Sequence, residues 1–271
     1  MVGENGAGKT TLMSILFGMP VISETGGFGG KIILNGEEVH FTSPFDALDA
    51  GIGMVHQEFS LIPGFTTTEN IMLNREITKN NILADIFGPR LCTLNRAEMK
   101  KSAEESVAKL GVEIDSETKI AEMPVGHKQF VEIAREISRE KVKLLVLDEP
   151  TGELDPASSV QIFSLLKKLN EEKGITVVIA EQKIMLLCEY VKKLIVLEKG
   201  NCVHYGEIRS TLTHQKEMEE AGINCPRVLT LTGKMVEEGL VPASFTNEDR
   251  ICLDAKEAAV FVEKCIGAKT E

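Results

Sequence analysis

The stretch that decides the fold is Gly3-Glu4-Asn5-Gly6-Ala7-Gly8-Lys9-Thr10-Thr11. Its spacing, Gly-x-x-x-x-Gly-Lys-Thr, is that of a phosphate-binding loop. Glycines allow successive backbone N–H groups to form an anion-binding concavity at the N-terminus of a helix. We therefore expect residues 3–11 to bind the phosphates of a nucleotide, with Lys9 at the β- and γ-phosphates and the Thr10 hydroxyl on Mg²⁺. The predicted ligand-binding residues are Gly3, Asn5, Gly6, Ala7, Gly8, Lys9, Thr10 and Thr11.

A second element carries two acids. Leu144-Leu-Val-Leu147 is a short apolar run, typical of a buried strand of a parallel sheet, and it is followed by Asp148-Glu149. Nucleotides bind at the carboxyl ends of such strands in open α/β sheets. We expect Asp148 to hold Mg²⁺, directly or through water, and Glu149 to polarise an attacking water as general base.

The order of the remaining elements predicts an α/β protein, because strand patterns alternate with helical ones. A carboxylate and a proline at Asp155-Pro156 begin one helix, and Gly174 ends it. We expect an approximate domain boundary near Gly206, between a nucleotide-binding domain, residues 1–206, and a C-terminal helical extension, residues 207–271. Between residues 60 and 95 the pattern is mixed, with breakers at Pro63-Gly64 and Gly88-Pro89. Strands are expected at 31–34, 52–56, 143–147, 175–180 and in a hairpin over 194–205, and helices at 12–17, 96–110, 125–138, 155–173 and 254–266.

Composition excludes several classes of protein. The 271 residues hold 30 Lys and Arg against 41 Asp and Glu, a net charge of −11, which disfavours binding to nucleic acid or anionic lipid through net charge. No apolar run approaches the roughly 18 residues that a membrane helix needs, so direct membrane insertion is not expected. None of the six cysteines has C-x-x-C spacing, which disfavours a zinc knuckle and favours a reducing compartment.

Five ordered motifs resemble the nucleotide-binding domain of ATP-binding-cassette (ABC) transporters over roughly residues 1–205. Gly126 precedes Asp148 by 22 residues, the usual separation of the family's signature and acid. The resemblance implies a P-loop NTPase fold of the ABC-cassette type. Such a cassette has a mostly parallel core sheet, an antiparallel β part and a helical signature subdomain. The motifs are the phosphate loop, Val55-His56-Gln57-Glu58, Met123-Pro124-Val125-Gly126-His127-Lys128-Gln129, Asp148-Glu149-Pro150-Thr151 and Gly152-Glu153-Leu154-Asp155.

The resemblance also implies a mechanism and partners. Two cassettes would dimerise head to tail around ATP and Mg²⁺, with Val125, Gly126 and His127 of one chain at the γ-phosphate of the other. Gln57 would contact Mg²⁺ and link it to a transmembrane permease. Asp155 would bridge the dimer, while a role only as the N-cap of its own helix remains equally open. The chain would then be cytoplasmic, held at the inner face of the membrane by the permease, and would hydrolyse ATP to drive import.

Within the family, the first half looks most like importers of simple sugars and nucleosides, through Val55–Glu58, Thr68-Glu69-Asn70-Ile71 and Val131-Glu132-Ile133-Ala134. The stretch from Ala180-Glu181-Gln182 to Gly200, and loosely the tail, looks more like the cobalt and vitamin energy-coupling cassettes. The transported substrate and the choice between homodimer and heterodimer therefore stay open.

Three departures from the family motivate an alternative. The segment that precedes the phosphate loop in the family is absent, which favours a fragment or a misplaced start codon and predicts an exposed apolar strand edge. Pro124 occupies the signature serine position and offers neither a hydroxyl nor an N–H. Gln182 occupies the switch-histidine position, where it can bond a γ-phosphate or water but cannot carry a proton charge. The alternative is an impaired or truncated cassette that serves as the degenerate half of a heterodimer. A cassette that acts on ribosomes or DNA is disfavoured by the acidic charge.

Overall fold

The computed structural model describes residues 1–80, 92–139, 141–240 and 251–267. The chain divides into two compact units: unit 1 comprises residues 1–15 and 179–271, and unit 2 comprises residues 16–178. The boundary that the sequence suggests near residue 206 stays a prediction.

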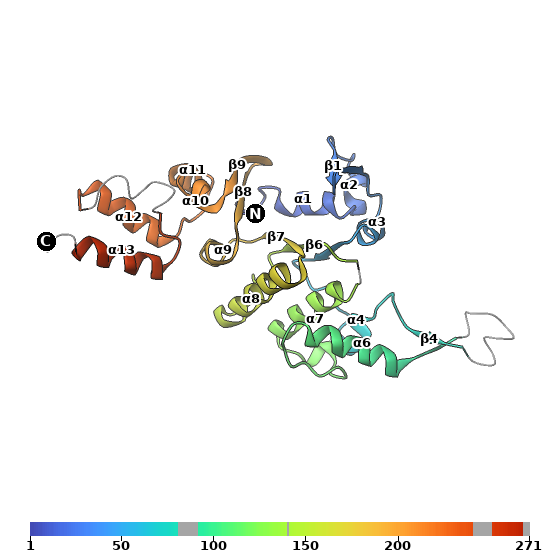
Figure 1. Ribbon diagram of the computed structural model, residues 1–271. Coiled ribbons are helices and arrows are strands. Elements are labelled where there is room, and N and C mark those ends of the chain that lie inside the picture. Colours follow the sequence, from blue (N-terminus) through green and yellow to red (C-terminus); the bar gives the residue numbers. More distant parts are fainter. Residues whose placement is uncertain (81–91, 140, 241–250, 268–271) are drawn as a thin grey trace. The chain divides into compact units, whose positions relative to one another are not determined.

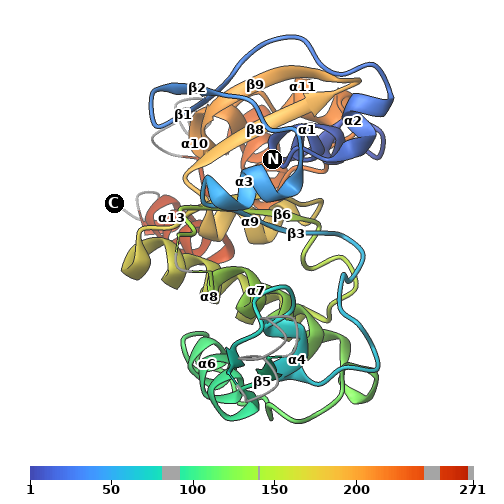
Figure 2. The same cartoon turned by 90° about the vertical axis from the view of Figure 1, so that its right-hand side faces the viewer.

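Unit 1 is built on an antiparallel hairpin of β8 (Lys193–Glu198) and β9 (Asn201–Glu207), as the sequence predicts. Lys199 and Gly200 form its turn with positive φ values of 47° and 82°. Helix α10 (Ile208–Leu212) packs against both strands of this hairpin (Figures 1 and 2). The helices of this unit are α1 (Lys9–Leu16), α9 (Ile184–Tyr190), α10 (Ile208–Leu212), α11 (Gln215–Glu220), α12 (Arg227–Glu237) and α13 (Ala255–Gly267).

Met1 and Val2 form a short stretch of strand that leads into the phosphate loop. Val2 bridges Val196 of β8 in parallel, and Met1 and Val2 are buried, at 7% and 1% exposure. The exposed apolar edge that we expected is therefore not found at these two residues, because Met1 bonds Ile179 and Glu181 on one side and Val2 bonds β8 on the other. Four backbone hydrogen bonds hold them: Met1 N to Ile179 O (2.6 Å), Glu181 N to Met1 O (3.1 Å), Val2 N to Ile195 O (2.8 Å) and Leu197 N to Val2 O (2.9 Å).

A three-stranded sheet has the order β3 (Ile52–Val55), β6 (Leu144–Asp148), β7 (Thr176–Ala180), and all of it except the last two residues of β7 belongs to unit 2. Strands β3 and β6 are parallel and almost wholly buried, which confirms the predicted parallel core. Helix α8 (Pro156–Lys173) begins and ends where the sequence predicts: the Asp155 side chain caps its N-terminus, and Gly174 ends it in the left-handed conformation (φ 66°).

A helical part of unit 2 is formed by α4 (Thr67–Ile71), α6 (Arg96–Ala108) and α7 (Val125–Ile137), which pack on one another (Figure 2). A 3₁₀ turn at Ile120–Glu122 precedes α7. Helices α6 and α7 confirm the predicted ones. The sequence did not indicate α4, because five residues are too few to show a helical apolar period. Its start is set by a capping box in which Thr66 and Glu69 bond each other's backbone N–H.

The rest of unit 2 consists of short elements. A turn at Asn35-Gly36, where both φ values are positive (54° and 88°), joins two antiparallel strands. The breaker Gly88-Pro89 lies outside the described residues. These elements are α2 (Pro20–Glu24), β1 (Ile32–Leu34), β2 (Glu37–Val39), α3 (Pro44–Asp49), and the small hairpin of β4 (Thr78–Lys79) and β5 (Thr93–Leu94).

Candidate functional site

The phosphate loop has the backbone that its glycines predict. Gly6 and Gly8 adopt left-handed φ values of 83° and 99°, which other residues rarely tolerate. A Cβ on Gly3 would lie 2.5 Å from the carbonyl oxygen of Leu197, so only glycine fits there. The amide of Gly200, in the turn between β8 and β9, donates to Ala7 O at 3.0 Å and fixes the loop from outside.

Lys9 is buried (5% exposed), and its ammonium group donates to the carbonyl oxygens of Gly3 (2.8 Å) and Glu4 (3.2 Å) of the same loop. Thr10 and Thr11, the next two residues of α1, are exposed. The ammonium group of Lys9 is therefore held within the loop, at the N-terminus of α1. Both this positive charge and the helix N-terminus favour the binding of an anion there. In α1 the buried apolar residue is Met13, whereas Leu12 is 36% exposed; Phe17, just after the helix, is also buried.

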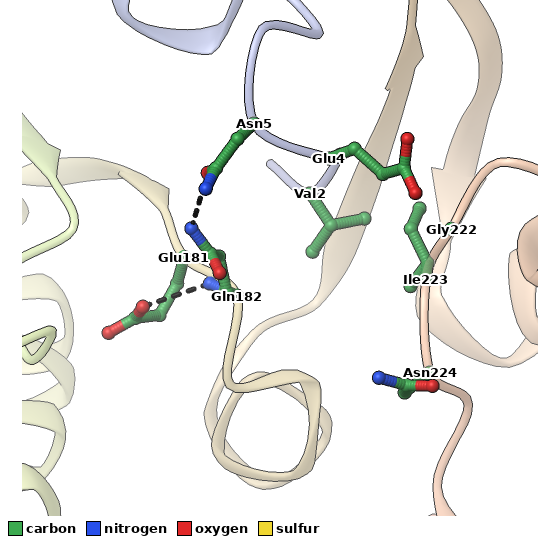
Figure 3. A pocket seen from close by; sticks show the side chains of 9 residues that line it. Val2, Glu4, Asn5, Glu181, Gln182, Gly222, Ile223 and Asn224 are labelled. Carbon is green, nitrogen blue, oxygen red and sulfur yellow. Dashed lines mark hydrogen bonds between the residues drawn. The ribbon is translucent and has the colours of Figure 1, made fainter.

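Gln182 lies beside the phosphate loop. Its Nε2 donates to Oδ1 of Asn5 at 2.8 Å, and its backbone N donates to the carboxylate of the buried Glu181 at 2.9 Å. Figure 3 shows Asn5 and Gln182 pointing toward one another. The structure thus brings two of the predicted residues together. They border a polar pocket of about 360 Å³, lined by Val2, Gly3, Glu4, Asn5, Glu181, Gln182, Gly222, Ile223 and Asn224.

The C-terminal part of unit 1 forms the far wall of this pocket. Gly222 has a φ of 72°, and a Cβ placed on it would overlap the Glu4 carboxylate, at 1.9 Å from Oε1. In Figure 3 the Glu4 side chain extends toward Gly222. The segment after α11 therefore contacts the phosphate loop directly, which sequence reasoning missed. The only local signal was a glycine at a helix C-terminus.

In unit 2, three predicted residues lie at the carboxyl ends of neighbouring strands. Val55 of β3 is paired in register with Leu147 of β6, so the segment that contains Gln57 and the acids Asp148 and Glu149 leave the same edge of the sheet. Gln57 is exposed, whereas the preceding His56 is half-buried and packs edge-on against Phe17, with 6.0 Å between ring centroids. Burial lowers the pKa of His56, so its imidazole is neutral at physiological pH.

Asp148 has the environment of a cation ligand. The residue is 1% exposed, and its Oδ1 has no hydrogen-bond partner among the described residues. A buried carboxylate oxygen without a partner is costly, and a metal ion satisfies it. This one carboxylate oxygen is of the kind that Mg²⁺ prefers as a ligand.

Glu149 carries backbone strain. Its φ is +47°, a left-handed value that costs a non-glycine residue on the order of 1 kcal/mol. A tight turn follows, in which Gly152 N donates to Glu149 O at 3.0 Å. Such strain is typical of functional sites, and here it sets the direction of the side chain of the predicted general base.

The predicted signature residues lie at the N-terminus of α7. Pro124 is the N-cap and gives no side-chain hydrogen bond, as expected from its lack of a hydroxyl. Ser158 Oγ lies 3.3 Å from the position of a Cβ on Gly126, and it donates to Asp155 Oδ2 at 2.5 Å. The hydrogen bond from the Ser158 hydroxyl is the main reason that the pKa of Asp155 is lowered. Together these residues border a pocket of about 250 Å³, lined by Pro124, Val125, Gly126, His127, Phe130, Glu153, Leu154, Asp155, Ser158 and Gln161.

Sequence reasoning also missed a buried charged cluster on α7. Glu132 is fully buried, and its Oε1 accepts a hydrogen bond from Ser60 N at 2.5 Å. Arg135 lies 3.8 Å from Glu132 and 3.2 Å from Glu136. Burial is the largest effect on Glu132 and raises its pKa to about 7. Three charged residues within one helical turn were a signal, but their spacing suits an exposed helix face equally well.

Comparison with known proteins places the chain. A family model described as "ABC transporter" matches residues 1–152, more than half of the chain. A ribose import ATP-binding protein, RbsA, of Burkholderia mallei is 36% identical over 211 residues, which cover 78% of this chain and 38% of that protein. A glucose import ATP-binding protein, TsgD13, of Haloferax volcanii is 31% identical over 258 residues, which cover 88% of this chain and 45% of that protein. The chain thus spans less than half the length of these curated relatives.

Solved structures agree on the fold. The cbiO1 protein of Clostridium perfringens, part of an ABC transporter complex, superposes with a TM-score of 0.62 at 23% identity, covering 87% of this chain and 85% of that one. The ATP-binding cassette MJ0796, solved as a dimer bound to ADP and phosphate, gives a TM-score of 0.58 at 26% identity, with 76% and 83% covered. No helix among the described residues has the length and apolar character needed to span a membrane. From its phosphate loop, its parallel sheet and its match over residues 1–152, the chain belongs to the ABC transporter family.

Proposed function

We propose that this chain is the ATP-binding and ATP-hydrolysing subunit of an importer for a sugar. The observation that carries the proposal is the phosphate loop, with Lys9 drawn into the loop and Gly6 and Gly8 in left-handed conformations. The family membership and the names of the sugar-import relatives support the substrate class.

Each predicted residue has a role in this proposal. The amides of residues 3–11 and Lys9 bind the phosphates, Asn5 and Gln182 act at the γ-phosphate end, and Thr10, Gln57 and Asp148 hold Mg²⁺. The bound ion would neutralise phosphate charge. Glu149 orients and polarises the attacking water. Val125, Gly126, His127 and Asp155 act across a dimer of cassettes.

The proposed partners are a second cassette and a transmembrane permease, which would hold the chain at the cytoplasmic face of the membrane. A dimer is supported by the dimeric MJ0796 cassette. The alternative of a degenerate half gains no support from the comparisons, although Pro124 still lacks the hydroxyl that would bond a nucleotide.

ATP binding and ATP hydrolysis are tested separately. Purified chain should bind ATP with Mg²⁺, and Lys9→Ala should lose most of that binding. Steady-state hydrolysis should be present and should collapse in Glu149→Gln, which keeps the shape of the side chain but removes the base. Binding without hydrolysis in either protein would favour the degenerate half, and no ATP binding at all would overturn the proposal. Uptake of labelled ribose and glucose by cells with and without the gene tests the substrate class.

A further inference from the structure

The segment Gln57–Ile62 lies between β3 and α4 and contains no helix or strand. Ser60 and Ile62 of this segment are exposed, so their backbone N–H and C=O groups could bond water as well as protein groups. Here the partners are side chains of the helical part of unit 2.

Two side-chain clamps hold alternate residues of this segment. At Ser60, the N–H donates to Glu132 Oε1 (2.5 Å) and the carbonyl accepts from Arg135 Nη1 (3.1 Å). At Ile62, the N–H donates to Asn70 Oδ1 (2.7 Å) and the carbonyl accepts from Asn70 Nδ2 (3.1 Å). Each residue has both backbone groups paired, as it would beside a neighbouring strand, and Leu61 between them is buried.

The clamps belong to one packed body. Glu132 and Asn70 are fully buried, and the Arg135 side chain is 10% exposed. Arg75, just after α4, donates from Nη2 to Ser138 Oγ (2.6 Å) and to Arg135 O (3.3 Å) at the far end of α7. Helices α4 and α7 are thus tied together, and the segment is tied to both.

The buried carboxylate of Glu132 is unfavourable for stability, because an apolar side chain would fill the same space at a lower free-energy cost. Glu132 has a distant ion partner in Arg135, and its Oε2 has no hydrogen-bond partner among the described residues. What an apolar residue cannot supply is the acceptor for Ser60 N. We propose that Glu132, Arg135 and Asn70 are positioning residues for Gln57. They make the segment after Gln57 move with α7, the helix whose N-terminus carries Val125 and Gly126.

The first arm of the test uses no nucleotide, so it does not depend on the proposed function. Amide hydrogen exchange, resolved by residue, compares the full chain with Glu132→Ala, Glu132→Gln and Asn70→Ala. Loss of the acceptor in Glu132→Ala should speed exchange of the Ser60 amide by roughly tenfold or more, and Asn70→Ala should do the same at Ile62. Glu132→Gln keeps an acceptor and should keep Ser60 protected. Glu122→Gln, a change of an exposed acid just before α7, is the matched control. Equal exchange of Ser60 in the full chain and in Glu132→Ala would overturn the proposal.

The second arm rests on the proposed role of Gln57 at Mg²⁺. ATP affinity is measured with Mg²⁺ and with a chelator. Glu132→Ala should lose affinity only with Mg²⁺, by the same factor as Gln57→Ala, and the double variant should lose no more than either single one. Independent, additive losses would overturn the positioning role. If the unmodified chain binds no ATP, the proposed function fails, and the exchange arm alone decides whether the clamps exist.

Discussion

Glu132 makes the stability of this protein depend on pH in a direction opposite to that of most carboxylates. Its pKa is raised from 4.5 to about 7, first by burial and to a smaller extent by Glu136, against the opposing effects of Arg135 and the Ser60 N–H. The perturbation that isolates this effect is Glu132→Gln, which stays neutral at every pH and keeps an oxygen for the Ser60 amide.

The direction in which the free energy of unfolding changes with pH follows from proton linkage. Between pH 4.5 and about pH 7 the folded state holds a proton on Glu132 that the unfolded state has released. The free energy of unfolding therefore falls as pH rises through this window and is level above it. At about 1.4 kcal/mol per pKa unit, the full loss is about 3 kcal/mol.

The assay is urea unfolding of the unmodified chain and of Glu132→Gln at constant ionic strength, from about pH 4.5 to about pH 8. Taking the difference between the two proteins removes the titration of all other groups. We expect the variant to gain stability relative to the unmodified chain by about 3 kcal/mol across that range. Glu122→Gln should show no such trend. A difference that is constant with pH, or that shrinks as pH rises, would refute the reasoning and would mean that Arg135 keeps Glu132 ionised.

Three further predictions concern the site. Glu149→Gly should raise the free energy of unfolding by about 1 kcal/mol, because glycine adopts a positive φ without strain, and should lose ATP hydrolysis; a less stable variant would contradict the strain. Asp155→Ala should cost about 1 kcal/mol of stability through loss of the N-cap, whereas Asp155→Asn should keep it, as thermal unfolding can check. Gly222→Ala should displace the Glu4 side chain and lower the melting temperature, because a Cβ there overlaps Glu4 at a positive φ; an unchanged melting temperature and an unchanged ATP affinity would together show that this contact is not formed.

The local backbone conformation of the site depends on residues that are adjacent in the sequence, so it could be predicted from the sequence. The left-handed glycines of the phosphate loop, the buried strand that ends at Asp148, the Asp155 cap and the Gly174 stop all depend on backbone preferences of a few adjacent positions. These preferences act whatever the rest of the chain does, so the pattern of residues was enough to predict a parallel α/β sheet with acids at its edge.

Other features were decided only by the tertiary structure. Ser60 and Glu132 are 72 residues apart, and Gly222 and Glu4 are 218 apart, so no local pattern indicates that they meet. The burial that raises the pKa of Glu132 comes from the packing of the helices around it, and Met1 and Val2 are covered because residues near 180 and 196 pair with them on both sides. The sequence therefore determined the local backbone of the site, whereas long-range packing decided which side chains hold its segments and which of those are charged, because contacts and burial depend on distant residues.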